Sequence, residues 1–484
     1  MSIAIVEAHR ELARIARDFL SAKRARNEAR AQLDAPVDRL PSFWNEMAEL
    51  GWLGLHVAES HGGQGFALAE LAVVLEELGR AVAPGPFLPT TLASALIVEK
   101  GDETLASALL PRLVDGSTVA AVGLGGDLML DDDGTLTGSG GLVLSGELAQ
   151  LFVLPAGNDV VIVDRDRVGL SVDSVLNVDP SRRVTAVRAE RVDVPHDLVL
   201  SGARAALTRL ARTLGAAEAS GGAQACTEMA TEYAKVREQF GRPIGTFQAV
   251  KHHCANMLVA AEQITAGAWG ATRGGLSVEE AELAAAVAAC LALPNYTFCA
   301  EVNIQVHGGI GFTWEHDAHL YLRRATALSA LIGPVDQARE EVTQLKGEGI
   351  ETPLSIALPP EAESIRPRVR AFVETLRSVP DDEKRRTLAE SGYLVPHWPK
   401  PFGLDAGPIE QLVIEEEFAG VERPNLGVTG WNTLTILQRG TPAQVDRYVG
   451  ASLAGEIEFC QLFSEPGAGS DAAAVSTRGV KVEG

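Results

Sequence analysis

The spacing of apolar residues over the first hundred positions predicts helices. Four of them recur at i, i+3, i+4 and i+7, which places them on one helix face: Leu12, Ile15, Ala16 and Phe19. The same spacing returns over residues 68–75. Three glycines within residues 62–65 interrupt the pattern, as expected of a turn. We therefore predict an N-terminal helical domain over residues 1–115.

After this helical segment the pattern changes. Short apolar runs, such as Val119–Leu124 and Val160–Val163, are separated by turn residues such as Asp131–Gly134. Short runs bounded by Asp and Gly are typical of strands. We predict a small antiparallel β domain over residues 116–202, followed by a helical bundle over residues 203–345, where helical spacing returns.

Residues 346–364 carry neither period and contain Gly, Pro and Ser, so we interpret them as a linker. Beyond them the opening pattern recurs. Residues 389–394 resemble residues 48–53, and the acidic-apolar run at 412–418 resembles the one at 73–78. Long internal repeats of this kind indicate a duplicated structural unit.

The repeat predicts two copies of one unit. Copy one extends to residue 345, and copy two is expected to have its N-terminal helical domain over residues 365–458. Residues 459–484 would then begin the β domain of copy two, so we expect half of the second unit to be absent. The predicted fold class is α+β and mainly α.

Composition excludes several functions. The chain has 484 residues, of which 46% are hydrophobic and 22% charged, as in ordinary globular proteins. Its formal net charge of −22 repels phosphate backbones and anionic lipids, which argues against nucleic-acid binding and membrane attachment. No apolar run reaches about 18 residues, so no membrane span is expected. The amphipathic N-terminus lacks the features of a secretory signal, and we predict a cytoplasmic location.

The five cysteines include no C-x-x-C pair, which argues against a zinc cluster. Their odd number also argues against a disulfide framework. We expect buried, reduced thiols and no metal site.

Three segments carry the candidate chemistry: Tyr233–His252, Gln305–Phe312 and Leu462–Asp471. In this order, and within a helix–β–helix layout, they resemble the flavin-dependent acyl-CoA dehydrogenase family, and in particular its fused or tandem bacterial members. The resemblance covers nearly the whole chain, once as a full unit and once as a partial one. It implies an N-terminal helical domain, a middle β domain and a C-terminal four-helix bundle in each full unit.

The side chains of the first two segments suit a dinucleotide. A guanidinium such as that of Arg237 matches a pyrophosphate, and Phe240 offers an aromatic face to a ring. The resemblance implies that Arg237, Gln239, Phe240, Gln305 and Gly309 bind the adenosine-diphosphate side of an FAD held by a neighbouring subunit. The alternative is that Arg237 forms a surface salt bridge and the glycines simply end helices.

The third segment places hydroxyls and backbone N–H donors along a tight turn, an arrangement that binds anionic or carbonyl oxygens. The resemblance implies that Phe463, Ser464, Gly469 and Ser470 line the flavin ring and the thioester. The alternative is a Ser- and Gly-rich surface loop. Copy one has no such turn, because residues 119–129 there are mostly apolar. We therefore do not expect copy one to hold a flavin ring by itself.

The catalytic base of the family is not found. Its reaction removes a proton α to the thioester carbonyl, and a carboxylate in a dry pocket suits this step because desolvation raises its pKa. The resemblance places that glutamate at Ile332 or, in some relatives, at Ala211, and neither residue ionises. The other nearby carboxylates are expected on solvated helix faces: Glu218, Glu228, Glu315 and Glu340.

The leading hypothesis is an FAD-dependent acyl-CoA dehydrogenase of lipid metabolism, in β-oxidation or steroid side-chain degradation. Copy one would supply the adenosine-diphosphate side of the flavin site and copy two the flavin and thioester turn. An electron-accepting flavoprotein and a homo- or hetero-oligomer are the implied partners. One alternative is a catalytically inactive subunit that supports a partner acyl-CoA dehydrogenase. A lesser alternative is a flavin-dependent hydroxylase or oxidase.

Overall fold

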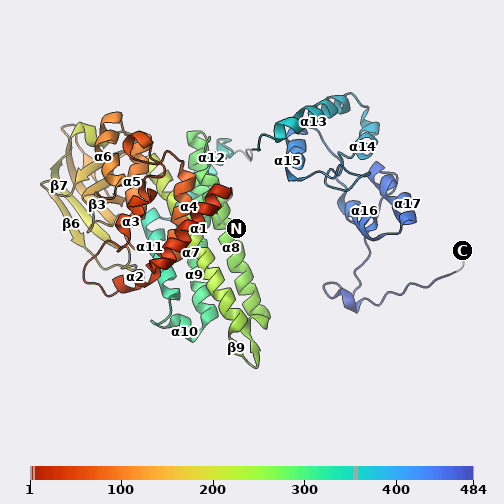
Figure 1. The fold of residues 1–484 in the computed structure, drawn as a ribbon, viewed down its shortest axis with the longest axis horizontal. Helices are drawn as coiled ribbons and strands as arrows, with labels where there is room; N and C mark the ends of the chain where they lie inside the picture. The colour runs from red at the N-terminus through yellow and green to blue at the C-terminus, as the bar shows by residue number, and fades with distance from the viewer. Residues whose placement is uncertain (1–2, 4–5, 353–357, 483–484) are drawn as a thin grey trace. The chain divides into compact units, whose positions relative to one another are not determined.

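The computed structural model describes residues 3, 6–352 and 358–482, which form two compact units divided between residues 353 and 354 (Figure 1). Each unit has its own apolar core. The chain is mainly helical with one large sheet, so the predicted α+β fold class is confirmed. Of the predicted linker, residues 353–357 lie outside the described residues.

The first unit begins with six helices: α1 (Glu7–Ala22), α2 (Ala25–Gln32), α3 (Trp44–Glu49), α4 (Leu68–Ala81), α5 (Phe87–Lys100) and α6 (Glu103–Val114). α1 buries Ala13, Ala16 and Leu20, whereas Ile15 is 42% exposed. The face buried in the core therefore shares only Ala16 with the four residues that the spacing placed together. The contact with α4 turns the smaller alanines, rather than Ile15, toward the core.

Eight strands follow: β1 (Ala120–Gly123), β2 (Met129–Leu130), β3 (Thr135–Leu144), β4 (Leu151–Ala156), β5 (Asp159–Asp164), β6 (Leu170–Ser174), β7 (Val184–Asp193) and β8 (Val199–Leu200). They form one sheet in the order β6-β7-β3-β1-β4-β5-β8, with β2 paired to β3. The sheet is not wholly antiparallel as predicted, because β1 and β4 pair in parallel, with Ala120 opposite Leu151. Both strands are buried along their whole length, and β1 packs against α5.

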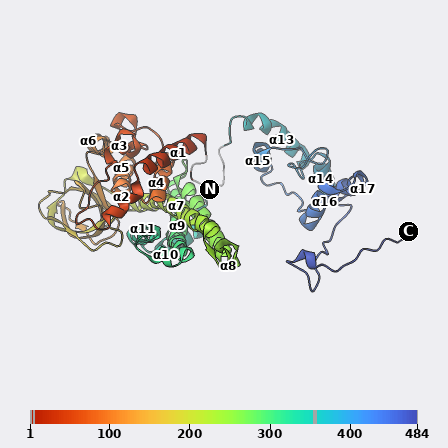
Figure 2. The same cartoon turned by 60° about the horizontal axis from the view of Figure 1, so that its bottom comes forward.

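The bundle consists of α7 (Arg204–Val236), α8 (Gln248–Thr272), α9 (Val278–His307), α10 (Gly309–Phe312), α11 (Ala318–Ile332) and α12 (Val335–Gly347). α7, α8 and α9 run side by side in both views (Figures 1 and 2). Ser277 and Glu280 form a capping box that starts α9. By length and composition α9 is apolar enough to cross a membrane, but 61% of its most apolar window is buried inside the protein.

Glycines allow α4 and α7 to approach closely. A Cβ on Gly79 would lie 2.0 Å from the carbonyl oxygen of Glu218, and a Cβ on Gly221 would lie 1.7 Å from that of Glu76. Because neither position has room for a side chain, the two backbones pack directly against each other.

A buried ion network joins the β domain to the bundle. Glu218 of α7 accepts hydrogen bonds from Arg182 at 2.5 Å and from Arg324 of α11 at 2.8 Å. Arg324 also donates to Asp179 at 2.5 Å and to the carbonyl of Ala83, just after α4, at 3.1 Å. All four charged side chains are at most 5% exposed. The expectation that Glu218 lies on a solvated face was therefore wrong.

The network keeps its carboxylates ionised. Burial alone would raise the pKa of Glu218, but the charges of Arg182 and Arg324 outweigh burial and lower it. Asp179 behaves in the same way, with Arg324 as the main counter-charge that lowers its pKa.

The second unit contains five helices: α13 (Ala362–Arg377), α14 (Asp381–Glu390), α15 (Pro408–Glu417), α16 (Gly427–Arg439) and α17 (Pro442–Ala454). Its core includes stacked Phe372 and Tyr393, with ring centroids 4.3 Å apart. Arg385 of α14 donates to the carbonyls of Ser452 and Leu453 at 3.1 Å and so caps the end of α17.

The described residues after α17 contain no strand of a sheet, only an isolated bridge between Glu465 and Ala468. The start of a β domain at residues 459–484 therefore stays a prediction. Cys226 and Cys299 are buried as expected, whereas Cys254 and Cys290 are partly exposed and Cys460 is exposed. That part of the cysteine prediction was wrong.

We expect Glu218→Gln to lower the free energy of unfolding by about 3–5 kcal/mol, because it leaves Arg182 and Arg324 buried without their shared counter-charge. Urea unfolding measures the change. Glu232→Gln, which removes an exposed charge from the same helix, is the control and should cost less than about 1 kcal/mol. Equal effects of the two substitutions would contradict a role for the network.

Stability should also fall on acidification. The folded-state pKa of Glu218 lies below its ordinary 4.5, and that of Asp179 below its ordinary 3.8. Carboxylates with lowered pKa stabilise the protein above the ordinary values, and this contribution is lost as the pH falls through the folded values. We therefore expect unfolding free energy to fall below about pH 4.5, and to fall less steeply in Glu218→Gln. Parallel slopes for both proteins would contradict the assignment.

Candidate flavin-binding segments and the adjoining cavity

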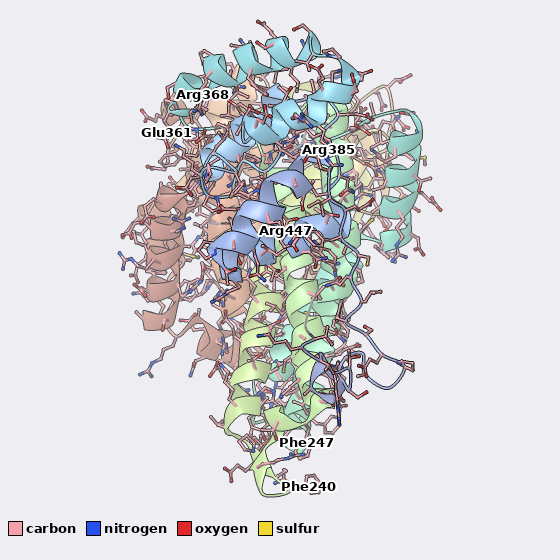
Figure 3. All side chains as sticks on the ribbon, turned by 90° about the vertical axis from the view of Figure 1, so that its right-hand side faces the viewer. Phe240, Phe247, Glu361, Arg368, Arg385 and Arg447 are labelled. Carbon is pink, nitrogen blue, oxygen red and sulfur yellow. The ribbon has the colours of Figure 1, made fainter. Side chains whose placement is uncertain are left out.

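A two-residue hairpin joins α7 to α8. Its strands are β9 (Glu238–Gln239) and β10 (Arg242–Pro243). Phe240 and Gly241 form the turn with φ of +54° and +75°, the positive pair that a tight hairpin turn requires. Phe240 stands at the tip and is 92% exposed (Figure 3).

The hairpin carries aromatic and basic groups together. The guanidinium of Arg242 lies 4.2 Å from the ring centroid of Phe247, at the start of α8. The rings of Phe240 and Phe247 meet edge to face, 5.9 Å apart. Gln239 is exposed, and its side chain donates only to the carbonyl of Glu238 at 2.7 Å. This end of the bundle thus presents stacking surfaces and donors to the exterior.

Arg237 has a fixed backbone and an uncommitted side chain. Its N–H donates to Tyr233 at 2.8 Å, and its carbonyl accepts from Ile244 at 2.8 Å. The side chain is exposed and forms no ion pair within the part of the chain that the structure describes. The surface salt bridge considered as an alternative is therefore not what the structure shows for Arg237.

The turn after α9 is open. Gly308 ends the helix with φ of +63°, and a Cβ on Gly308 or Gly309 would meet nothing within 4 Å. By contrast, a Cβ on Gly311 would lie 2.6 Å from the carbonyl of Ile304. Internal packing therefore explains Gly311 but not Gly309, whose bare backbone permits close approach of a ligand. Gln305 is exposed one turn earlier.

His307 links the two segments. Its ring stacks on Tyr233 of α7 with centroids 4.4 Å apart, and its Nδ1 lies 2.8 Å from the carbonyl of Asn303. Burial lowers the pKa of His307, so the ring is neutral at pH 7. The sequence-predicted residues at 237–240 and 305–309 are thus held at the same end of the bundle by contact between α7 and α9.

The position expected for the catalytic glutamate lines a cavity of about 490 Å³ between the β domain and the bundle. Ile332 forms part of its wall and packs so closely on α7 that a Cβ on Gly215 would lie 2.4 Å from Ile332 Cδ1. Among the described lining residues the only carboxylate is Asp179, which is paired with Arg324. Ala211, the second expected position, is buried within α7. The cavity therefore offers no free carboxylate to accept a proton.

The turn in the second unit is exposed and organised by one carboxylate. Glu465 accepts from the backbone N–H groups of Ser476 at 2.9 Å and Thr477 at 2.6 Å. Hydrogen bonds from these two residues lower the pKa of Glu465 to about 2. The sequence analysis did not assign this role to Glu465. The only feature in the sequence that pointed to it was the presence of a carboxylate inside the 462–471 motif.

The predicted residues of this turn lie around Glu465. Phe463 is 60% exposed, and Ser464, Gly469 and Ser470 are exposed as well. Neither serine hydroxyl has a hydrogen-bond partner within the described residues. Their donors and acceptors are therefore free to meet a ligand.

Two family models match the chain. The acyl-CoA dehydrogenase C-terminal domain matches residues 201–344, and the acyl-CoA dehydrogenase N-terminal domain matches residues 6–117 and again residues 360–456. The chain belongs to the acyl-CoA dehydrogenase family, as the sequence motifs predicted.

Individual relatives agree with this membership. Acyl-CoA dehydrogenase FadE34 of Mycobacterium tuberculosis is 40% identical over 443 residues, which span 90% of this chain and 61% of FadE34. Acyl-CoA dehydrogenase IpdE2 of the same organism is 35% identical and matches 64% of this chain and 88% of its own length.

Two solved structures share the fold. A variant of the Tcur3481–Tcur3483 steroid ACAD is 30% identical with a TM-score of 0.64, covering 71% of this chain and 98% of its own. The ChsE4–ChsE5 complex from Mycobacterium tuberculosis is 25% identical with a TM-score of 0.65, covering 73% of this chain and 100% of its own.

We expect Phe240→Gly to leave the free energy of unfolding unchanged within about 1 kcal/mol, because Phe240 is exposed and a left-handed backbone favours glycine. Phe152→Ala in the buried β4 is the contrast and should lose about 3–5 kcal/mol. Denaturant unfolding compares the two. A loss above about 2 kcal/mol in Phe240→Gly would mean that the residue serves the fold rather than a ligand.

Proposed function

We propose that this chain is part of an FAD-dependent acyl-CoA dehydrogenase that introduces a double bond between the α and β carbons of a CoA thioester. The observation that carries the proposal is the unpaired guanidinium of Arg237 at the same end of the bundle as the open turn at Gly308 and Gly309. A bound FAD supplies the hydride acceptor for this reaction.

The residues at this end of the bundle fit an adenosine diphosphate. Arg237 presents a planar fork to the pyrophosphate, and Phe240 offers an exposed ring to the adenine. Gln239 and Gln305 add donors and acceptors, and Gly309 lets the backbone approach. In a chain with a net charge of −22, a guanidinium that pairs with no carboxylate among the described residues keeps its attraction for an anionic ligand.

The turn at 463–470 would serve the flavin ring and the thioester. Ser464 and Ser470 have free hydroxyls, and Glu465 fixes the loop through its bonds to Ser476 and Thr477. In this proposal the first unit contributes the adenosine-diphosphate side and the second unit contributes the flavin turn, each to a site within an oligomer of acyl-CoA dehydrogenase units.

The proton acceptor would come from another acyl-CoA dehydrogenase unit. The cavity of the first unit has Ile332 at the position where the resemblance expects a glutamate, and the only carboxylate among its described lining residues, Asp179, is paired with Arg324. The substrate class follows from a relative described as a steroid ACAD, which favours the CoA thioester of a steroid side chain. An electron-transferring flavoprotein would then reoxidise the flavin.

The second candidate is a catalytically inactive subunit that supports a partner acyl-CoA dehydrogenase. One specific observation favours it, namely the absence of a free carboxylate among the described residues of the cavity. The free serine hydroxyls of the 463–470 turn favour the enzyme, because a scaffold has no need of them.

The first test is the absorption spectrum of the purified full chain titrated with FAD. We expect bound flavin, and we expect Arg237→Ala to weaken FAD binding at least about tenfold because it removes a charge-assisted contact. Arg39→Ala is the matched control, since Arg39 is also exposed, and it should bind FAD like the wild type. Failure to bind FAD, or equal effects of both substitutions, would contradict the proposal.

A second measurement separates the enzyme from the inactive subunit. The FAD-loaded chain is mixed with acyl-CoA thioesters, including one with a steroid side chain, and bleaching of the flavin is followed. Bleaching that is weakened in a Ser464→Ala, Ser470→Ala double variant supports the role of the second unit. Bound flavin that no thioester bleaches would favour the inactive subunit instead.

A further inference from the structure

A cavity lined by four arginines lies where the N-terminal helical domain meets the start of α11 in the bundle. It has a volume of about 340 Å³ and is formed where the α1–α2 turn meets the end of α4 and the start of α11, elements that lie together in Figures 1 and 2. Six charged residues line it: Arg17, Arg24, Arg26, Arg80, Glu77 and Asp317. It shares no lining residue with the cavity at Ile332 or with the segments assigned to the flavin.

Both carboxylates of this cavity are already engaged. Glu77 is 1% exposed and accepts from Arg17 at 2.7 and 2.9 Å. Asp317 accepts from Arg30, which is not a lining residue, at 2.6 and 3.1 Å. The Arg17–Glu77 pair is bidentate, whereas both hydrogen bonds from Arg30 end on Oδ1 of Asp317 and leave its Oδ2 at 3.9 Å from Arg26. Four arginines line the cavity against these two carboxylates. The remaining arginines of the cavity therefore carry an excess of positive charge.

Arg26 is incompletely satisfied. Its nearest carboxylate oxygen, on Asp317, is 3.9 Å away, beyond hydrogen-bond distance. Its guanidinium lies over the ring of Tyr321 at 5.4 Å, and its Nε is buried with no acceptor. A buried N–H group without an acceptor is costly, and an anion in the cavity would remove that cost.

Arg24 and Arg80 add to the same cavity. The side chain of Arg24 is exposed and has no partner within the described residues. Arg80 pairs with Glu228 at 2.6 Å, but its Nε lies 3.6 Å from Glu77 and is also buried without an acceptor. Three guanidiniums thus have unused donors in one small space.

Neutral donors complete the set. α2 begins inside the cavity, and its first intrahelical bonds run from Asn27 and Glu28 to the carbonyl of Arg24 at 2.8 and 3.2 Å. The N–H groups of Ala25 and Arg26 precede those bonds, so they are available to an anion at the positive end of the helix. The amide of Asn27 also lines the cavity without a partner.

We propose that this cavity binds a phosphate-bearing anion, a phosphate ester or pyrophosphate, at a site separate from the flavin and the thioester. The excess guanidinium donors and the helix N-terminus are the groups that recognise phosphate oxygens in proteins. The site stands out in a chain with 64 acidic and 42 basic residues, where most buried arginines meet carboxylates.

Isothermal titration of the full chain at low salt with pyrophosphate tests the proposal. We expect saturable binding that Arg24→Asn weakens at least about tenfold, because asparagine tolerates the left-handed backbone at φ +52° but carries no charge. Arg24→Lys should retain more binding than Arg24→Asn. Arg39→Ala should bind like the wild type. Arg237→Ala should leave in place the binding that Arg24→Asn removes, because Arg237 does not line this cavity.

The outcomes are distinct. No saturable binding by the wild type would overturn the proposal, as would a loss in Arg39→Ala equal to that in Arg24→Asn, which would indicate diffuse attraction. A loss confined to Arg237→Ala would assign the anion to the flavin segment and overturn the separate site. Repeating the titration with inorganic phosphate and with AMP identifies the source: equal affinities support free phosphate, and tighter binding of AMP supports a phosphate ester.

Discussion

The pairing of two guanidiniums with two carboxylates inside the first unit is the constraint on which the rest of that unit depends. Four charges at most 5% exposed are tolerable only if each finds its partner, because a single unpaired charge in that environment is strongly destabilising. The partners come from the β6–β7 loop, α7 and α11, and Arg324 also binds the carbonyl after α4. The network therefore sets the β domain, the N-terminal helices and the bundle in one arrangement.

This constraint also decides what the adjoining cavity can do. Asp179 and Arg182 face the cavity as well as belonging to the network. A carboxylate whose pKa is held low by an arginine is a weak base, so structural pairing and proton abstraction cannot be performed by the same group. With Ile332 in the wall, none of the described residues that line this cavity is a carboxylate free of an arginine partner.

Local patterns in the sequence predicted helices and turns. They did not predict features that depend on contacts with residues far away in the chain. Helical spacing located α4, and the Phe240–Gly241 turn lies within a recognisable motif. The spacing did not reveal that Ile15 is exposed, because Ala13, Ala16 and Leu20 form an equally regular face and only the contact with α4 selects between them. Glu218 looked like a solvated residue because its partners lie 36 and 106 positions away. The parallel pairing of β1 with β4 likewise could not be predicted from a short stretch of sequence, because it joins Ala120 to the distant Leu151.

The arginines of this chain sort into two kinds by what surrounds them. Arg182 and Arg324 are buried and paired with carboxylates, and these ion pairs connect the β6–β7 loop, α7 and α11. Arg237 and Arg24 lie beside a helix end, and no carboxylate among the described residues pairs with either, although the chain has an excess of acidic residues. In so acidic a protein an unmatched guanidinium is the exception, and it keeps its full attraction for an external anion. These two guanidiniums therefore lack a partner carboxylate among the described residues. This favours binding of an anionic ligand over a structural ion pair.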